Sequence, residues 1–501
     1  MTESAAGTRP AVDEPDPRRW KALTVTLVAG FMSLLDVSIV SVALPSIQRG
    51  LGTDPAGVQW VVSGYALTFG LALVPAGRLG DALGRRRVFL AALGAFVMFS
   101  ALVGAAPTTE LLIAARLAQG MAAGALAPQN SALIQQMFHG AERGRAFGLF
   151  GATVGISTAV GPVVGGVILA VAGEPDGWRW IFLVNVPIGL GALLLAARLL
   201  PGSGGSPTRP GRPGHLDLGG VALLGGGVLA TLLPLMEAES GGLARLWWLF
   251  PIGAVLLLGF VGWERRVVRR GVEPLIDLRL LTETPGYASG AALGMVYFAG
   301  FSGIWLVFAT FFQTGLGYTP LQSGLTVTSF ALGSAVSAVV GGRLVARIGR
   351  RLTVLGLGLV ALGLMATAVV LLLTPPSAAG PAAAATLLVA GIGGGWVIPP
   401  NTTMTLRCVP VRMAGSAGGA LQTGQRIGAA VGTAAVAAVF YAVLGASGRD
   451  FPQAVAVAVG SAALAVLLAM GIAVGELRAN RTAAGSSDLD AAAHHDGGRE
   501  C

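Results

Sequence analysis

Apolar stretches of about 20 residues recur along nearly the whole chain and constrain its fold more than any other feature. Inside a bilayer, every backbone polar group must be bonded within the protein, so repeated stretches of this length form spanning helices rather than barrel strands. Charged residues make up only 11 % of the chain and hydrophobic residues 54 %, which is too little charge for a soluble protein of this length. We therefore expect an all-α integral membrane protein.

The hydrophobic pattern predicts fourteen transmembrane helices joined by short connections rich in Gly, Pro or charge. Their ranges are 22–45, 57–77, 88–106, 111–134, 147–172, 180–200, 217–236, 246–263, 286–312, 320–341, 353–374, 382–404, 416–444 and 454–476. Residues 1–21 form a polar N-terminal segment without features of a cleavable signal peptide. Residues 477–501 are expected to form a disordered tail.

The basic residues indicate the orientation of these helices. If the N-terminus is cytoplasmic, most of the 33 Lys and Arg residues fall in cytoplasmic pieces of the chain, as the positive-inside rule requires. Because the number of spans is even, the C-terminus is then cytoplasmic as well.

An internal repeat divides the chain into related halves. The stretch GRLGDALGRRR at 77–87 is partly copied as GRLVARIGRRL at 342–352, and both follow the second span of a six-span set. We expect an N-terminal six-helix bundle at 22–200, a linker with two inserted transmembrane helices at 201–285, and a C-terminal six-helix bundle at 286–476. Halves in the same orientation are related by an axis along the membrane normal, and a substrate path would run between them.

Asp36 is the acidic residue that the sequence places deep within a span. Intramembrane acids face the bundle interior and commonly serve proton or ion pathways. Arg116, in the fourth span, lies at a similar depth on another helix and is the expected partner. The pair would hold while Asp36 is ionised and separate when it is protonated. Two alternatives remain: a purely structural ion pair, or an Arg116 that extends to the outer headgroups.

Two glycine-rich motifs suggest gating elements. In 77–87, Gly77 and Gly84 permit a tight path, Arg85 anchors the loop at the membrane face, and Asp81 can cap a nearby helix N-terminus. The alternative is a loop that only sets topology. In the fifth span, small residues surround Gly161 and Pro162, which favours close helix packing and a kink at the depth of Asp36. Gly and Pro are, however, generally common in membrane helices.

Polar residues within the spans are candidates for a cavity wall, although some will only join helices together. Arg426 could line the cavity or meet Asp36 in one conformation. The candidates are Gln59, Tyr65, Asn130, Gln313, Asn401, Gln422 and Arg426.

Several functional classes are disfavoured by the sequence. It shows no zinc-protease motif, no Walker loop and no catalytic constellation, so we expect neither an enzyme, nor a metal site, nor an ATP-driven transporter. The net charge of +9 is spread over short loops and does not indicate a nucleic-acid partner.

At this point the residues resemble a known family. GRLGDALGRRR is similar to the loop signature of the major facilitator superfamily, and RLAQG at 116–120 to its fourth-span motif. GISTAVGPVVGG at 155–166 resembles the motif of its proton-coupled antiporters. LDVSIVSVALPSI at 35–47 and WRWIFLVNVPIG at 178–189 resemble signatures of its fourteen-span drug:proton antiporter branch.

The resemblance implies efflux of small amphiphilic drugs or antibiotics across the plasma membrane in exchange for protons, by rocking of two six-helix bundles. It assigns coupling to Asp36 and Arg116, gating to Asp81 and Arg85, and the outer seal to Gly161 and Pro162. The expected protein is a monomer in the lipid bilayer without a cofactor, driven by the proton gradient. A specific metabolite transporter of the same fold, exporter or proton symporter, is the main alternative, and a polytopic membrane enzyme or sensor the other.

Overall fold

The computed structural model describes residues 17–53, 55–173, 176–202, 217–237, 242–272 and 274–491. Within these residues all regular elements are helices, and no strand is present. This agrees with the all-α class expected from the apolar stretches.

The first group of helices covers the predicted N-terminal half. It contains α1 (Arg19–Leu51), α2 (Pro55–Leu83), α3 (Arg85–Ala105), α4 (Thr109–Met137), α5 (Gly140–Ala172), α6 (Trp178–Leu183) and α7 (Asn185–Leu199). Gly84 alone separates α2 from α3, and its φ of 98° is a conformation that residues with a Cβ rarely adopt.

Four helices follow in the predicted linker: α8 (Leu218–Met236), α9 (Gly242–Leu246), α10 (Leu249–Arg269) and α11 (Arg279–Glu283). The long ones, α8 and α10, pack along each other. Gly227 lies against Leu257, and Gly253 lies against Gly227 and Thr231, so α8 and α10 run antiparallel. We call α8 and α10 the inserted helix pair.

The second group covers the predicted C-terminal half. It contains α12 (Tyr287–Phe301), α13 (Ile304–Thr310), a π-helix (Phe311–Gly315), α14 (Pro320–Ile348), α15 (Arg350–Leu373), α16 (Pro376–Gly395), α17 (Ile398–Thr405), a short 3₁₀ helix (Val411–Met413), α18 (Ala414–Ala446) and α19 (Phe451–Ala491). Three predicted single spans are broken helices, at α6/α7, α12/α13 and α16/α17. Pro399 and Pro400 open α17, where their missing N–H groups cost nothing.

Thirteen helical segments in the described part of the chain are long and apolar enough to cross a membrane. The predicted span at 246–263 corresponds to α10, which is not among the thirteen. Its charged end, beginning at Glu264, shortens the apolar part of the helix. The protein is therefore a multi-pass membrane protein, and the fourteenth span stays a prediction.

The tail prediction was wrong in part. Helix α19 continues to Ala491, well beyond Glu476, where disorder was expected to begin. Leu477, Arg478, Ala479 and Arg481 are strong helix formers and follow the apolar stretch directly, so the helix continues after that stretch ends. Residues 492–501 lie outside the described residues, as do residues 1–16.

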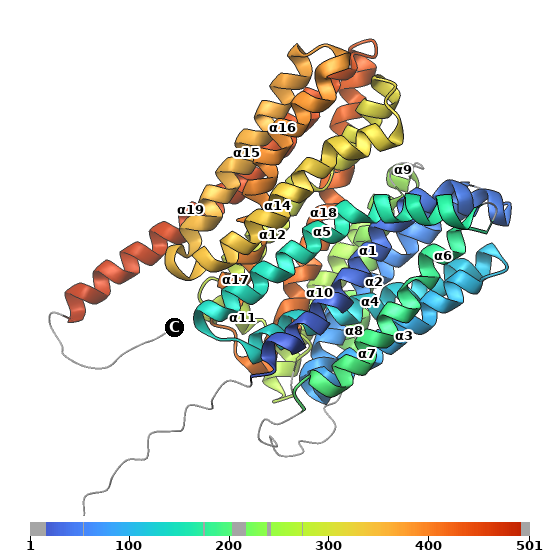
Figure 1. The fold of residues 1–501 in the computed structure, drawn as a ribbon. Coiled ribbons are helices and arrows are strands. Elements are labelled where there is room, and N and C mark those ends of the chain that lie inside the picture. Colours follow the sequence, from blue (N-terminus) through green and yellow to red (C-terminus); the bar gives the residue numbers. More distant parts are fainter. Residues whose placement is uncertain are drawn as a thin grey trace, which may run out of the picture.

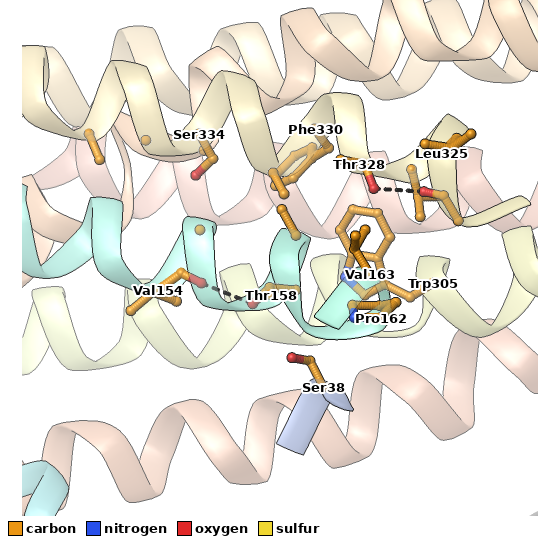
Figure 2. Close-up of a pocket in the computed structure, with 18 of the residues that line it drawn as sticks. Ser38, Val154, Thr158, Pro162, Val163, Trp305, Leu325, Thr328, Phe330 and Ser334 are labelled. Carbon is orange, nitrogen blue, oxygen red and sulfur yellow. Dashed lines mark hydrogen bonds between the residues drawn. The ribbon is translucent and has the colours of Figure 1, made fainter. Parts of the chain in front are cut away.

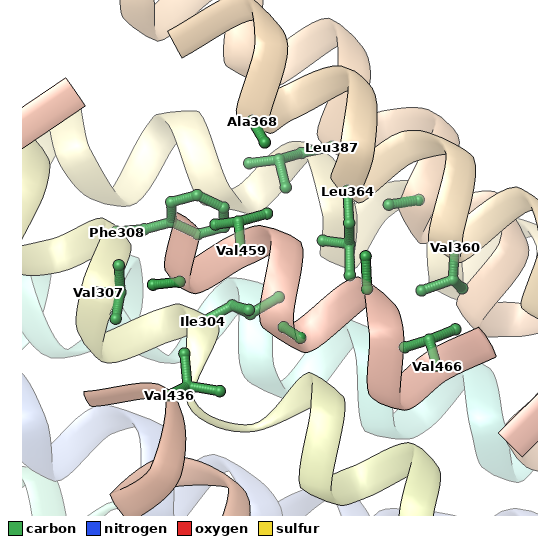
Figure 3. Packing of buried hydrophobic residues seen from close by; sticks show 14 of the residues in the cluster. Ile304, Val307, Phe308, Val360, Leu364, Ala368, Leu387, Val436, Val459 and Val466 are labelled. Atoms are coloured by element: carbon green, nitrogen blue, oxygen red, sulfur yellow. The ribbon is translucent and has the colours of Figure 1, made fainter. Parts of the chain in front are cut away.

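Each half has its own apolar core. In the second half, Phe308 of α13, Leu364 of α15, Leu387 of α16 and Val459 of α19 are fully buried in one cluster, in which Figure 3 shows side chains from these helices meeting around α19. Such interdigitation makes each half a packed unit.

The two halves meet along two helix pairs, α5 with α14 and α2 with α18. A Cβ at Gly148 would lie 2.8 Å from the carbonyl oxygen of Ala338, and one at Gly77 would lie 2.2 Å from that of Gly415. These close approaches need glycine and lie toward the ends of the helices near the described N-terminus. From there the two groups diverge (Figure 1).

Candidate functional site

Asp36 lies in a closed polar network inside the first half. The carboxylate is fully buried, and Nη1 of Arg116 lies 2.5 Å from its Oδ2. The predicted pairing of α1 with α4 is therefore confirmed. A buried pair of this kind is stable only when the remaining polar atoms also find partners.

Three neutral side chains complete the network. The amides of Gln119 and Asn185 each donate to Oδ1 of Asp36 at 3.1 Å. Both also donate to the hydroxyl of Ser100, at 2.9 and 3.1 Å. Sequence reasoning assigned none of Ser100, Gln119 and Asn185 to this site. Gln119 stands three residues after Arg116, and this spacing places both side chains on one face of the helix. The spacing could therefore have predicted that Gln119 belongs to the site.

Arg116 is enclosed from the other sides as well. Its Nε donates to the carbonyl of Val61 at 3.0 Å, and its guanidinium carbon lies 4.2 Å from the ring centre of Tyr65. Tyr65 was expected to line a cavity, and this was wrong: only 2 % of it is exposed, and its hydroxyl donates to the carbonyl of Ser33. The face of the Tyr65 ring packs against the buried guanidinium of Arg116.

The second site joins the two halves at Asp81. Its two carboxylate oxygens accept the backbone N–H groups of Gly415 and Ser416 at 3.0 and 2.8 Å. The predicted capping of a nearby helix N-terminus is confirmed, and the helix is α18 of the other half. Negative charge is favourable at such a terminus because its N–H groups lack partners within the helix.

Arg85 holds this junction from the neighbouring helix. It donates to Asp81 at 3.2 Å, to the carbonyl of Ala132 at 3.1 Å, and to the carbonyl of Val411 in the second half. Arg85 therefore bonds both halves. Its role in gating, like that of Asp81, Gly77 and Gly84, stays a prediction.

The repeat places Arg350 where Arg85 stands in the first half. Arg350 is 3 % exposed and lies 2.9 Å from Glu476 of α19 and 2.5 Å from Oδ1 of Asn401. Asn401 was expected at the cavity wall. Instead it accepts from Arg350 and donates to the carbonyl of Gly290, so it joins α17 to α15 and α12. With Ala346 in the position of Asp81, the acid that pairs with this arginine comes from another helix.

A cavity of about 740 Å³ lies between the halves. Its wall is formed chiefly by α5 and α14, with contributions from α1, α12, α13, α16 and α17. Figure 2 shows Thr158 and Pro162 of α5 facing Thr328 and Phe330 of α14, with Trp305 beside them. The lining is apolar apart from a few hydroxyl groups and the Trp305 indole, and it includes no charged side chain.

None of the seven polar residues predicted for a cavity wall lines this cavity. Asn130 is 2 % exposed, Gln422 donates to Ser131, and Gln313 is exposed in the π-helix. Gln59 borders only a hollow of about 10 Å³ beside α8. Arg426 stacks 4.5 Å from the ring of Phe69 and forms no ion pair with Asp36. The prediction failed because it selected polar residues, whereas this wall is built from small and apolar ones.

Gly161 and Pro162 lie where α5 packs against α1 beside the cavity. A Cβ at Gly161 would lie 1.9 Å from the hydroxyl of Ser38, so only glycine lets α5 approach α1 here. Pro162 lines the cavity. Both lie next to the part of α1 that carries Asp36, as predicted, while their role as a seal stays a prediction.

The match of a family model decides what class of protein this arrangement belongs to. The model described as Major Facilitator Superfamily matches residues 26–273 and 290–492. The chain belongs to the major facilitator superfamily. It is therefore a member of a family of membrane transporters, as two helical halves around a cavity indicate.

Curated relatives from actinobacteria are similar over most of their length. The chain is 37 % identical to a probable actinorhodin transporter of Streptomyces coelicolor, over 86 % of this chain and 74 % of that protein. It is 36 % identical to a puromycin resistance protein of Streptomyces alboniger, over 93 % and 91 %. It is 33 % identical to the multidrug resistance protein Stp of Mycobacterium tuberculosis, over 85 % and 76 %.

Among solved structures, the human organic anion transporter MFSD10 is similar in fold. The TM-score is 0.66 at 17 % identity, covering 92 % of this chain and all of that one. The xylose symporter XylE has a TM-score of 0.62 at 14 % identity, covering 90 % and 95 %. At these identities the similarity shows the fold alone.

Proposed function

We propose that this superfamily member exports amphiphilic organic molecules, antibiotics among them, across the plasma membrane in exchange for protons. The relatives named for antibiotic transport and multidrug resistance support this cargo class. The cavity supports it too, because a space of about 740 Å³ with apolar walls and a few hydroxyls suits a bulky, largely apolar molecule. The function would need no cofactor and only one copy of the chain.

Helix α1 supports the proposed proton coupling because it runs between the polar network of Asp36 and the cavity. Asp36 points into the sealed network, whereas Ser38, two residues later, lines the cavity and donates to the carbonyl of Ser157 on α5. A change in the Asp36–Arg116 pair would therefore move the wall of the cavity through α1 itself. Protonation of Asp36 removes the negative charge that holds Arg116. The proton that enters down a membrane potential supplies about 2.3 kcal/mol per 100 mV for the transport step.

The proposed topology has fourteen spans with both termini in the cytoplasm. Because α8 and α10 run antiparallel along each other, a chain that crosses the membrane in α8 would return in α10. This keeps the two halves in the same orientation and leaves the arginine-rich loops on one side. The junctions at Asp81 and Gly148 would then close the cytoplasmic side, with the cavity toward the outside.

Transport in inverted membrane vesicles tests the proposal. Puromycin uptake driven by an imposed pH gradient should fall at least tenfold in Asp36→Asn, because the amide keeps the shape of the side chain and takes up no proton. Asp176→Asn, which changes an exposed acid paired with Arg179, is the matched control and should transport normally. An Asp36→Asn protein whose transport keeps its pH dependence would refute the coupling site. Proton-driven movement in the opposite direction would instead favour an importer of the same fold.

A further inference from the structure

Two carboxyl groups meet where the inserted helix pair ends. Asp217 caps α8: it accepts the N–H of Gly220 at 2.9 Å and also the indole N–H of Trp263 at 2.8 Å. Glu264 is the next residue after Trp263 and is fully buried. It accepts the N–H of Leu275 at 3.3 Å. The network of Asp36 does not include either acid.

Gly220 lets the two carboxyl groups approach each other. A Cβ at this position would lie 2.4 Å from Oδ2 of Asp217 and 2.9 Å from Oε1 of Glu264. Oδ2 of Asp217 and Oε2 of Glu264 are both buried, and neither finds a donor among the described residues. Two ionised carboxylates in this position would repel each other, whereas a single shared proton removes the repulsion and supplies a donor between the two groups.

The surroundings favour the protonated form of Glu264. Burial, followed by the charge of Asp217, raises the pKa of Glu264 to about 8. On α10 itself, Arg265 and Arg266 are exposed, whereas Glu264 is buried. Among the charged residues that the structure describes on neighbouring elements, Asp277 pairs with Arg279 and lies in the field of Arg412, Asp81 pairs with Arg85, and Arg426 stacks on Phe69.

The N–H bonded to Glu264 belongs to a segment that ties the inserted helix pair to the rest of the protein. Leu275 is 1 % exposed and packs in a cluster with Val74 of α2, Val228 of α8 and Phe260 of α10. Ala420 of α18 packs against the same cluster. The helices α2 and α18 are the pair whose ends join at Asp81 and Gly415.

We propose that Asp217 and Glu264 form a second proton-binding site, distinct from Asp36, on the side of the protein that carries the arginine-rich loops. Its proton holds the ends of the inserted helix pair together and keeps the Leu275 segment packed against α2 and α18. Loss of this proton leaves two facing carboxylates and loosens the packing beside the junction of the two halves. Alkaline conditions on this side of the membrane thus weaken the contact between the two halves.

Infrared spectroscopy of the full chain in nanodiscs tests the site directly. A protonated buried carboxyl has a C=O stretching band that a carboxylate lacks. The wild type should lose such a band with a midpoint near pH 8, and Glu264→Gln should lack it. Glu283→Gln, which changes an exposed acid of the same linker, is the control and should retain it. Asp36→Asn should retain it too, which separates this proton from the one proposed for transport.

Thermal unfolding between pH 6 and 10 gives the second readout. Because the pKa of Glu264 is raised from 4.5 to about 8 in the folded protein, the free energy of unfolding falls as pH rises from about 4.5 to 8, and this group changes it no further above pH 8. Glu264→Gln keeps an acceptor for Leu275 and can donate to Asp217, so its midpoint temperature should depend less on pH. If Glu264→Gln does not fold, Asp217→Asn should lower the midpoint pH of the infrared band. A wild type without a band titrating in this range, or a band unchanged in both variants, would overturn the proposal.

Discussion

At the residue scale, the Asp36–Arg116 pair illustrates why a buried charge depends on its partner. Arg116→Leu would leave Asp36 buried with only neutral donors, and breaking a buried pair in this way costs about 3–5 kcal/mol. We expect a marked fall in the thermal midpoint of the purified protein. The double variant Asp36→Asn/Arg116→Leu removes both charges and should recover part of this loss. Equal destabilisation by the single and double variants would show that the two charges do not act as a pair.

The sequence revealed the charged members of this site but not the neutral ones. Asp36 and Arg116 stand out because charge is rare in a span and needs a partner at the same depth. Ser100 and Asn185 come from other helices, and nothing in the spacing of one helix tells which face meets Asp36. Their place depends on how α3 and α7 pack against α1 and α4, which only the three-dimensional structure shows.

At the element scale, the apolar stretches predicted most helices and the repeated motif predicted the two halves, but neither predicted the breaks in the helices or most of their contacts. The glycines of α5 suggested close packing, and the structure supplies two partners: α14, which runs antiparallel to α5 and meets it at Gly148, and α1, which meets it at Gly161. Whether a small residue forms a helix–helix contact or has no close neighbour depends on what lies opposite to it. Gly148 meets backbone atoms, whereas nothing lies within 4 Å of a Cβ at Gly191.

This difference gives a matched pair of substitutions. Gly148→Val would place its side chain against Ala338 and Gly342 and should prevent α5 and α14 from closing on this side. We expect transport to fall at least tenfold, while Gly191→Val on α7 should transport at nearly the wild-type rate. Vesicle transport measured alongside the amount of folded protein separates a blocked closure from misfolding. Wild-type transport by Gly148→Val would show that this contact is not needed in the cycle.

At the scale of the whole molecule, the cavity exists because the two halves touch at one end and diverge toward the other. Alternating access requires that the contacts between the halves separate in another state. A Cβ at Gly155 of α5 would lie 3.1 Å from that of Ala335 of α14, close to the spacing of about 3.5–4.5 Å between the Cβ atoms of a disulfide. With Cys408 and Cys501 replaced by Ser, the double variant Gly155→Cys/Ala335→Cys should cross-link on oxidation and stop transporting, and reductant should restore both. Each single-cysteine variant controls for oxidation alone. Complete cross-linking with unchanged transport would mean that the halves do not separate along α5 and α14, because a covalent bond there leaves no room for rocking.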